Sequence, residues 1–321
     1  SQCDLLFICF QKKATVLSVF FSNFAPNKLR LGVYTFLAHT YYSCENKNDK
    51  IRMGKKVLFV NQEIMPYVPK TEMSSYGAEM PHIMQEAGFE IRTFMPRWGN
   101  INERRGQLHE VIRLSGMNLI IDDTDHPLII KVASIPQTRI QVYFIDNEDY
   151  FQKRPAMTKD ELGNDYPDNG ERAIFFARGV LETVKKLRWT PDVIHCQGWM
   201  SSVIPFYVKT AYKDEPQFAN SKVVTSLFAE QPQDSLGTNF KHCLEFREAK
   251  AKYLKNYGDN FDFKELGKLA IDYSDGVIGT SDGVHTDLIN YAKSNDKQLL
   301  EHPIDDTELK EKYSEFYNKL F

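Results

Sequence analysis

The stretch Trp189–Tyr207 reads WTPDVIHCQGWMSSVIPFY and decides the fold class that the sequence predicts. Pro191 ends a preceding helical pattern, and Val193–Cys196 is a short apolar run typical of a buried parallel strand. Gly198 then permits a sharp exit into a second helix. Ligands of open α/β sheets bind outside the carboxyl ends of the strands, so this turn supplies the first candidate site residues. They are His195, Gln197, Gly198, Trp199 and Met200.

Apolar runs elsewhere extend this unit into an α/β domain. Lys56–Asn61 predicts a first strand, Glu90–Met95 predicts a second, and the helix between them would be capped by Ser74 or Ser75. We expect Val57–Phe59, Val193–His195 and Val223–Thr225 to be neighbouring parallel strands. Further strands are predicted at 118–121, 128–133, 140–145, 222–227 and 276–279, and further helices at 169–187, 246–257, 263–271, 283–293 and 307–321. The pattern predicts a Rossmann-like three-layer domain with a mostly parallel sheet, extended by a meander at 118–145.

Composition narrows the class of partner. The net charge is −3 and the sequence pI about 6.3, which argues against nucleic acid or an anionic membrane as the main partner. Five cysteines occur without a C-x-x-C pair, and eight histidines are scattered along the chain. The sequence therefore predicts no metal site and no disulfide framework, no cofactor is expected, and a reducing cytoplasm is the default location.

Residues 1–52 differ from the rest of the chain. Cys3, Cys9 and Cys44 lie there among crowded aromatic residues, whereas a strong strand begins just after Met53. The favoured interpretation is an extension or upstream translation that is poorly ordered, with Met53 as the real start. The alternative is a targeting segment, with two lysines ahead of the apolar run Ala14–Phe21. We expect the domain itself to span 53–300 and a helix within 301–321 to dock on it.

Three ordered motifs resemble the N-terminal domain of bacterial glycogen and starch synthases. VYFIDNEDYF at Val142–Phe151 resembles the family's VYFIDNPEYF, and DNGERAIFFARGVLE at Asp168–Glu182 resembles its DNxERFxFFxRAxLE. WTPDVIHCQGWM at Trp189–Met200 is similar to WxPDVVHAHDWH. Weaker matches, such as Glu63-x-x-Pro66, extend the resemblance over about Lys56 to Ser281. The Asp168 motif is also compatible with a helix cap carrying an internal ion pair.

The resemblance implies the acceptor-side half of a retaining glucosyltransferase of the two-domain GT-B fold. Such an enzyme transfers glucose from ADP-glucose to an α-1,4-glucan in the cleft between its domains. The implied substrate-binding residues are Glu63, Lys70, His195, Gly198 and Trp199. From the residues themselves, His195 also fits a core histidine whose hydrogen bonds are satisfied, and Trp199 fits either core or cleft wall.

Departures from the family pattern affect the chemistry directly. The paired glycines of the loop after the first strand are replaced by Thr71, Glu72 or Met73, and Met200 stands where the family has a histidine. A thioether cannot donate a hydrogen bond or carry charge. The position of the motif's aspartate is held by Gly198.

We therefore expect no intact catalytic residue. The chain would lack the donor-binding domain and be inactive alone, with an α-glucan as a partner and ADP-glucose bound only if a donor domain is supplied. The alternative is a non-catalytic glucan-binding or synthase-partner protein.

Overall fold

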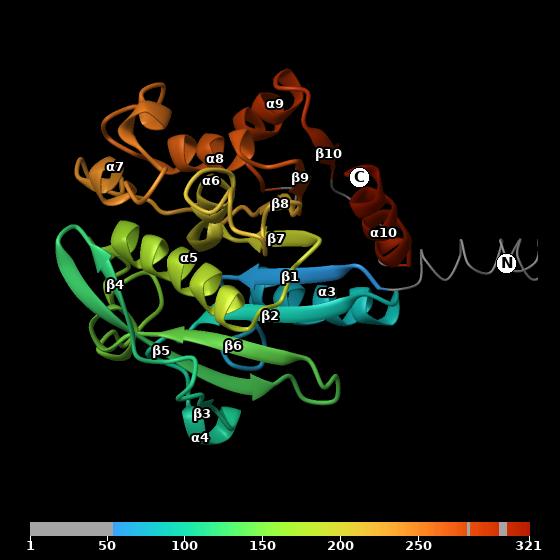
Figure 1. The fold of residues 1–321 in the computed structure, drawn as a ribbon, viewed down its shortest axis with the longest axis horizontal. Helices are drawn as coiled ribbons and strands as arrows, with labels where there is room; N and C mark the ends of the chain where they lie inside the picture. Colours follow the sequence, from blue (N-terminus) through green and yellow to red (C-terminus); the bar gives the residue numbers. More distant parts are fainter. Residues whose placement is uncertain (1–53, 281–282, 302–306) are drawn as a thin grey trace, which may run out of the picture. The chain divides into compact units, whose positions relative to one another are not determined.

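The computed structural model describes residues 54–280, 283–301 and 307–321, so the predicted extension at 1–52 lies outside the described residues. A ten-stranded sheet runs in the order β10-β9-β8-β7-β1-β2-β6-β5-β3, and β4 pairs with β5 (Figure 1). The strands are β1 (Lys56–Asn61), β2 (Glu90–Pro96), β3 (His109–Glu110), β4 (Met117–Ile121), β5 (Thr124–Ser134), β6 (Gln141–Asp146), β7 (Val193–Gln197), β8 (Lys222–Leu227), β9 (Gly276–Gly279) and β10 (Gln298–Leu300).

The sheet is parallel from β10 to β6 and antiparallel beyond it. Phe59 of β1 is in register with His195 of β7, and His195 is in register with Val224 of β8. The predicted neighbourhood of these three strands is therefore confirmed. The meander is confirmed as well, because β4, β5 and β6 pair in succession as antiparallel strands.

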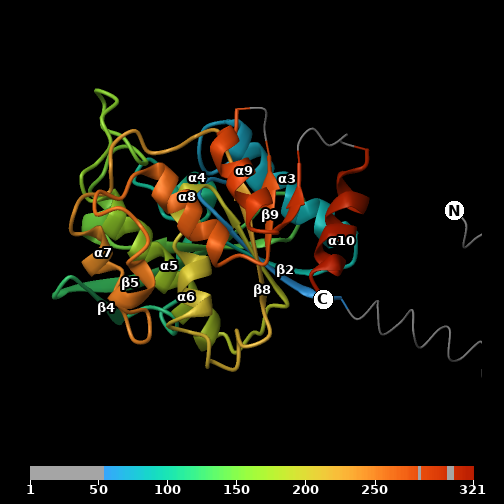
Figure 2. The ribbon, with the colours of Figure 1, turned by 90° about the horizontal axis from the view of Figure 1, so that it is seen from above.

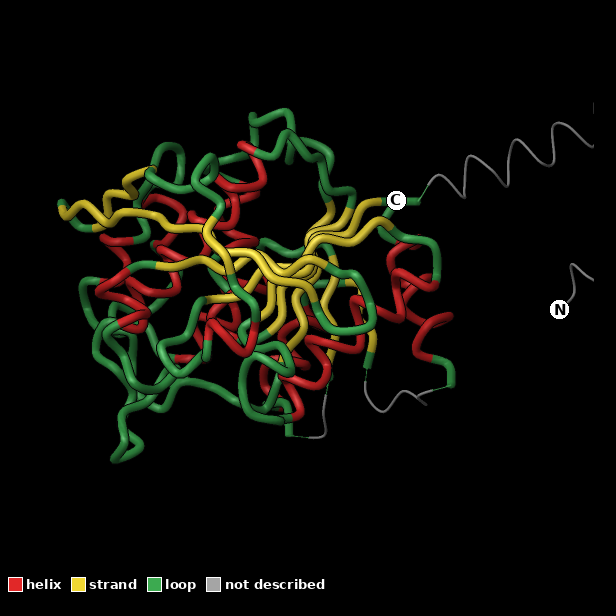
Figure 3. The backbone as a smooth tube through the Cα atoms, turned by 90° about the horizontal axis from the view of Figure 1, so that it is seen from below, coloured by secondary structure: helices red, strands yellow, loops and turns green. Residues whose placement is uncertain are grey.

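Side chains alternate between two helical layers because each central strand is buried on both faces. Leu58 and Val60 of β1 pack toward α5 (Asn169–Lys186), α6 (Ile204–Lys209) and α8 (Phe263–Asp272). Val57 and Phe59 pack on the other face, against α3 (Glu72–Glu86) and α10 (Leu309–Lys319). Figure 2 shows α3 and α10 on one side of the central strands and α5, α6 and α8 on the other. Figure 3 shows the strands as one twisted layer between helices. The architecture is the predicted three-layer α/β fold.

A further cluster of buried apolar side chains lies near β10, at one edge of the sheet. There α9 (Thr286–Ser294) packs Leu288 and Ala292 against Leu227 and Val277 of the sheet. The strand β10 was not predicted, because three residues are too few to produce a periodic signal.

Two helix predictions were wrong in detail. The N-cap of α3 is Thr71, whose side chain accepts from the Ser74 backbone N–H, while the Ser74 hydroxyl accepts from the Thr71 N–H. The helix predicted at 246–257 does not form. Phe246 and Ala249 instead close a tight backbone pair around Arg247, whose φ of 50° is left-handed and incompatible with a continuing helix. A single 3-10 turn, η3 (Ala251–Leu254), remains of it.

The helix that follows Asp168 begins where it was predicted to begin, but Asp168 does not cap it by a hydrogen bond. Asp168 occupies the N-cap position without making a capping hydrogen bond, and its carboxylate pairs with Arg154. Arg172 is fully buried and donates to the carbonyl oxygens of Tyr150 and Met157 at 2.8 and 2.7 Å. This motif therefore anchors the loop that follows β6.

Candidate functional site

One glutamine ties together three loops at the carboxyl edge of the central strands. Asn61 at the end of β1 is in register with Gln197 at the end of β7. The Gln62 backbone N–H donates to the Gln197 carbonyl at 3.0 Å, and the Gln62 Oε1 accepts from the Met200 N–H at 3.2 Å. The Gln62 Nε2 reaches Glu230, beyond β8, at 3.4 Å. The loops after β1, β7 and β8 are thus held in one arrangement.

Glu63 is the ionisable group at the centre of this edge. Its side chain is buried, and one carboxyl oxygen accepts from the Thr71 hydroxyl at 2.6 Å. Burial, together with the nearby charge of Glu230, raises the pKa of Glu63 to about 7, although hydrogen bonds from Thr71 and Gln62 oppose the shift. Glu63 can therefore exist in both protonation states near neutral pH.

The backbone and the neighbours of residue 198 leave room only for a glycine. Its φ is +84°, and a Cβ at this position would lie 2.8 Å from the Met73 sulfur and 2.8 Å from the Gln62 Cβ. A side chain here would need both a strained backbone and a displaced neighbour. An aspartate, as in the resembling motif, does not fit unless Met73 moves.

His195 lies inside the protein, away from the edge. It is fully buried, with Nδ1 2.6 Å from the Tyr317 hydroxyl of α10 and Nε2 2.6 Å from the Ser226 hydroxyl of β8. Burial lowers the pKa of His195 to about 3, so the ring is neutral. The core-histidine interpretation matches this placement, and His195 can affect a ligand only by positioning the strand ends.

The remaining candidates differ in exposure. Trp199 and Met200 form the short turn η2 (Trp199–Ser201) and are 4% and 0% exposed, so both belong to the wall beneath the edge. Lys70 is exposed on the loop before α3. The structure therefore brings Glu63, Gly198 and Trp199 to one edge and leaves Lys70 at its rim.

Several residues of this edge were absent from the predicted set. These are Gln62 and Thr71, which organise the edge. Gln197 was among the first candidates, and both polar atoms of its side chain are buried without a hydrogen-bond partner among the described residues. The strand-end rule could have identified Gln62, since it directly follows the last residue of the first strand. No sequence signal pointed to Thr71 as a partner of Glu63.

Two pockets lie elsewhere on the described residues. One, of about 630 Å³, lies beside β4 and α5, and the other, of about 640 Å³, lies beside Tyr67 and Arg105. No candidate residue at the strand edge lines either of them. No helix within 54–280, 283–301 and 307–321 is both long and apolar enough to cross a membrane.

Known proteins resemble this chain in sequence and in fold. The glycogen synthase of Chlorobium luteolum is 41% identical over 176 residues, which is 55% of this chain and 36% of the relative. That of Chlorobium limicola is 35% identical over 237 residues, 71% of this chain and 48% of the relative. The solved catalytic domain of starch synthase IV from Arabidopsis thaliana, bound to ADP and acarbose, superposes with a TM-score of 0.62 at 17% identity, covering 79% of this chain and 53% of that one.

These comparisons establish the fold and the family of the chain. It spans about half or less of the length of the relatives it matches. Its mostly parallel sheet, flanked by helices, matches the solved starch synthase over most of its length. Residues 56–301 match the family described as starch synthase catalytic domain. The chain therefore belongs to the family of starch synthase catalytic domains.

Proposed function

We propose that this chain is the acceptor-side half of a glucosyltransferase that adds glucose from ADP-glucose to an α-1,4-glucan. The observation that carries the proposal is the strand edge, where Gln62 connects three loops around the buried carboxyl of Glu63. Family membership and the glycogen synthase relatives support the substrate class.

We assign the glucan to this edge. Glu63 would accept hydrogen bonds from sugar hydroxyls. The turn Gly198–Trp199 would offer backbone groups and the edge of an aromatic ring, and Lys70 would contact the glucan from the exposed side of the site. His195 would not contact the glucan, because both of its ring nitrogens are already hydrogen-bonded. It would instead hold Ser226 of β8 in position.

Transfer is expected to need groups from a donor-binding domain. The departing diphosphate requires cations and hydrogen-bond donors aimed at the developing charge. Among the candidate residues Lys70 alone is a cation, and the thioether of Met200 supplies neither charge nor a donor. The proposal therefore predicts glucan binding with little turnover. The proposal also includes a cytoplasmic location and no nucleic-acid partner. It divides the chain into an extension at 1–52, a domain at 53–300 and a helix within 301–321 that docks on this domain.

Two measurements on the purified chain test this function. Affinity electrophoresis in glycogen should show retardation, and the Lys70→Ala variant should be retarded less than Lys255→Ala, which removes an equivalent exposed lysine far along the chain. Glucose incorporation from ADP-glucose into glycogen should stay near background. Robust turnover would refute the requirement for a donor domain, whereas the absence of both binding and turnover would refute the glucan site and leave a scaffolding role.

A further inference from the structure

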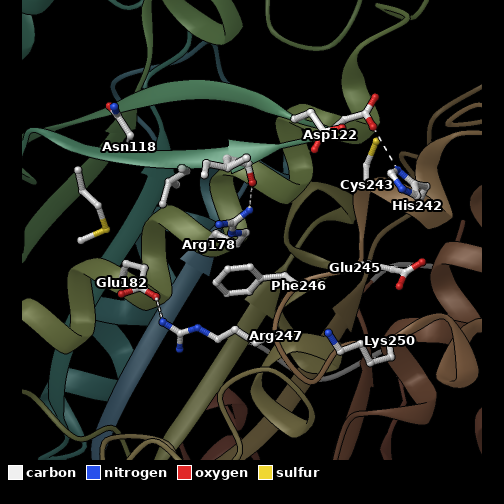
Figure 4. A pocket seen from close by; sticks show the side chains of 14 residues that line it. Asn118, Asp122, Arg178, Glu182, His242, Cys243, Glu245, Phe246, Arg247 and Lys250 are labelled. Carbon is white, nitrogen blue, oxygen red and sulfur yellow. Dashed lines mark hydrogen bonds and ion pairs between the residues drawn. The ribbon is translucent and has the colours of Figure 1, made fainter.

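The pocket of about 630 Å³ lies away from the strand edge (Figure 4). Its walls come from β4 and the turn after it, from α5, and from the segment that begins at α7 (Phe240–Cys243). Its volume falls within the range of small-molecule sites.

Arg178 of α5 forms the base of this pocket. Its side chain is 5% exposed, its guanidinium carbon lies 3.8 Å from the centre of the Phe246 ring, and its Nη1 donates to the Ile120 carbonyl. Its Nε is buried with no hydrogen-bond partner, and no carboxylate of the described residues lies within ion-pair distance. A buried charge without a counterion is costly, so this guanidinium favours an anion beside it.

Two further cations, Arg247 and Lys250, line the same pocket. The guanidinium carbon of Arg247 lies 4.9 Å from the centre of the same Phe246 ring, and its guanidinium is paired with Glu215 at 2.8 Å and with Glu182 at 3.4 Å. Lys250 lines the wall, and in the described part of the chain its ammonium has no ion-pair partner. Figure 4 shows Arg178 and Arg247 on opposite sides of Phe246, with the Arg247 guanidinium turned toward Glu182 and away from Lys250.

The acidic residues of the lining leave Arg178 and Lys250 without an ion-pair partner among the described residues. Glu182 accepts from the Tyr212 hydroxyl at 2.8 Å and also contacts Arg247 at 3.4 Å. The Asp122 carboxylate lies 3.1 Å from the His242 Nδ1 and accepts a hydrogen bond from the Asn239 side-chain amide. Asp123 and Glu245 are exposed to water, which screens their charge, and Glu245 points away from the Phe246 ring in Figure 4.

We propose that this pocket binds a phosphate group, either as the free ion or as the monoester of a small molecule. Arg178 and Lys250, two lining cations without a carboxylate partner among the described residues, suit a dianion better than a singly charged carboxylate, and a planar guanidinium matches the paired oxygens of a phosphate. The apolar wall formed by Met117, Leu119 and Ile120, together with a volume larger than one phosphate, leaves room for an organic group. The site is independent of the strand edge.

Isothermal titration calorimetry of the full chain with inorganic phosphate, glycerol 3-phosphate and acetate tests the proposal. We expect saturable binding of the phosphate compounds and a much weaker response to acetate. Arg178→Gln should weaken binding at least about tenfold, because hydrogen bonds to charged groups contribute roughly 1.5–3 kcal/mol. Lys250→Gln should weaken it about threefold, while the matched control Lys255→Gln, on an exposed lysine outside the pocket, should not change it.

The Lys250 variant decides the result if Arg178→Gln fails to fold, since Lys250 is exposed. Tighter binding of glycerol 3-phosphate than of phosphate would identify an ester site, and equal affinity would identify a site for the free ion. The proposal is overturned if the wild-type chain shows no saturable heat up to about 10 mM phosphate, if acetate binds equally well, or if Lys250→Gln binds as the wild type does.

Discussion

The side chain of Met73 packs against Gly198 so closely that a Cβ at residue 198 would stand 2.8 Å from the methionine sulfur. In the motifs that this chain resembles, the paired glycines of the loop are replaced here by Thr71, Glu72 or Met73, and the aspartate of the turn by Gly198. The methionine sulfur fills the space that a side chain at residue 198 would need, so the two residues form one packing arrangement at the strand edge.

This arrangement predicts a cost for any side chain at residue 198. Gly198→Ala should lower the free energy of unfolding by about 2–4 kcal/mol, because backbone strain at positive φ adds to overpacking. Gly163→Ala is the matched control, since Gly163 has a φ of +87° and nothing within 4 Å of an added Cβ. Urea denaturation should show the larger loss for Gly198→Ala, and Met73→Ala should recover part of it in the double variant. Equal losses for the two glycines would show that the contact with Met73 contributes nothing.

The raised pKa of Glu63 predicts a stability that depends on pH. Its pKa is about 7 in the folded protein against 4.5 for the unperturbed group, so the folded state holds the proton more tightly than the unfolded state between these values. The contribution of Glu63 is therefore complete below about pH 4.5 and is lost as the pH rises through 7. Glu63→Gln keeps an acceptor for Thr71 without this titration. Relative to wild type it should gain up to about 3 kcal/mol on going from pH 5 to pH 8.

Urea denaturation of both proteins across this range measures the difference directly. Glu248→Gln, at an exposed glutamate, is the control and should follow the wild-type pH dependence. A constant difference between Glu63→Gln and wild type would mean that Glu63 titrates normally in the folded protein.

The hydrogen bond between His195 and Tyr317 predicts that α10 stabilises the centre of the sheet. Tyr317→Phe leaves one ring nitrogen of His195 buried without a partner, and should cost about 1–3 kcal/mol of unfolding free energy. Tyr313→Phe, one turn earlier in the same apolar cluster, removes a hydroxyl that is not bonded to either ring nitrogen of His195, and it should cost less than Tyr317→Phe. Chemical denaturation of the two variants checks this, and similar losses would count against the buried hydrogen bond.

The central strands could be predicted from sequence because their signal is local. β1, β8 and β9 have the predicted bounds, since continuous apolar runs between turn residues specify buried strands. The helix predicted at 246–257 was wrong for a nonlocal reason. Phe246 is held between Arg178 and Arg247, and the left-handed backbone of Arg247 that this requires leaves no pattern in the sequence.

The strand edge was only partly predictable. The motif at Trp189–Met200 identified the turn, and the resemblance at Glu63-x-x-Pro66 identified Glu63. The sequence could not show that Thr71 would hydrogen-bond to Glu63, or that Met73 would pack on Gly198, because these contacts depend on how the loop before α3 folds over the edge.

The bond from Tyr317 to His195 spans 122 residues of sequence, and it joins a late helix to one of the central strands. During synthesis, the part of this sheet face that contacts α10 therefore stays uncovered while the 122 residues from His195 to Tyr317 are added. Its final packing is a late event on the ribosome, and until then apolar surface around His195 is exposed to other chains.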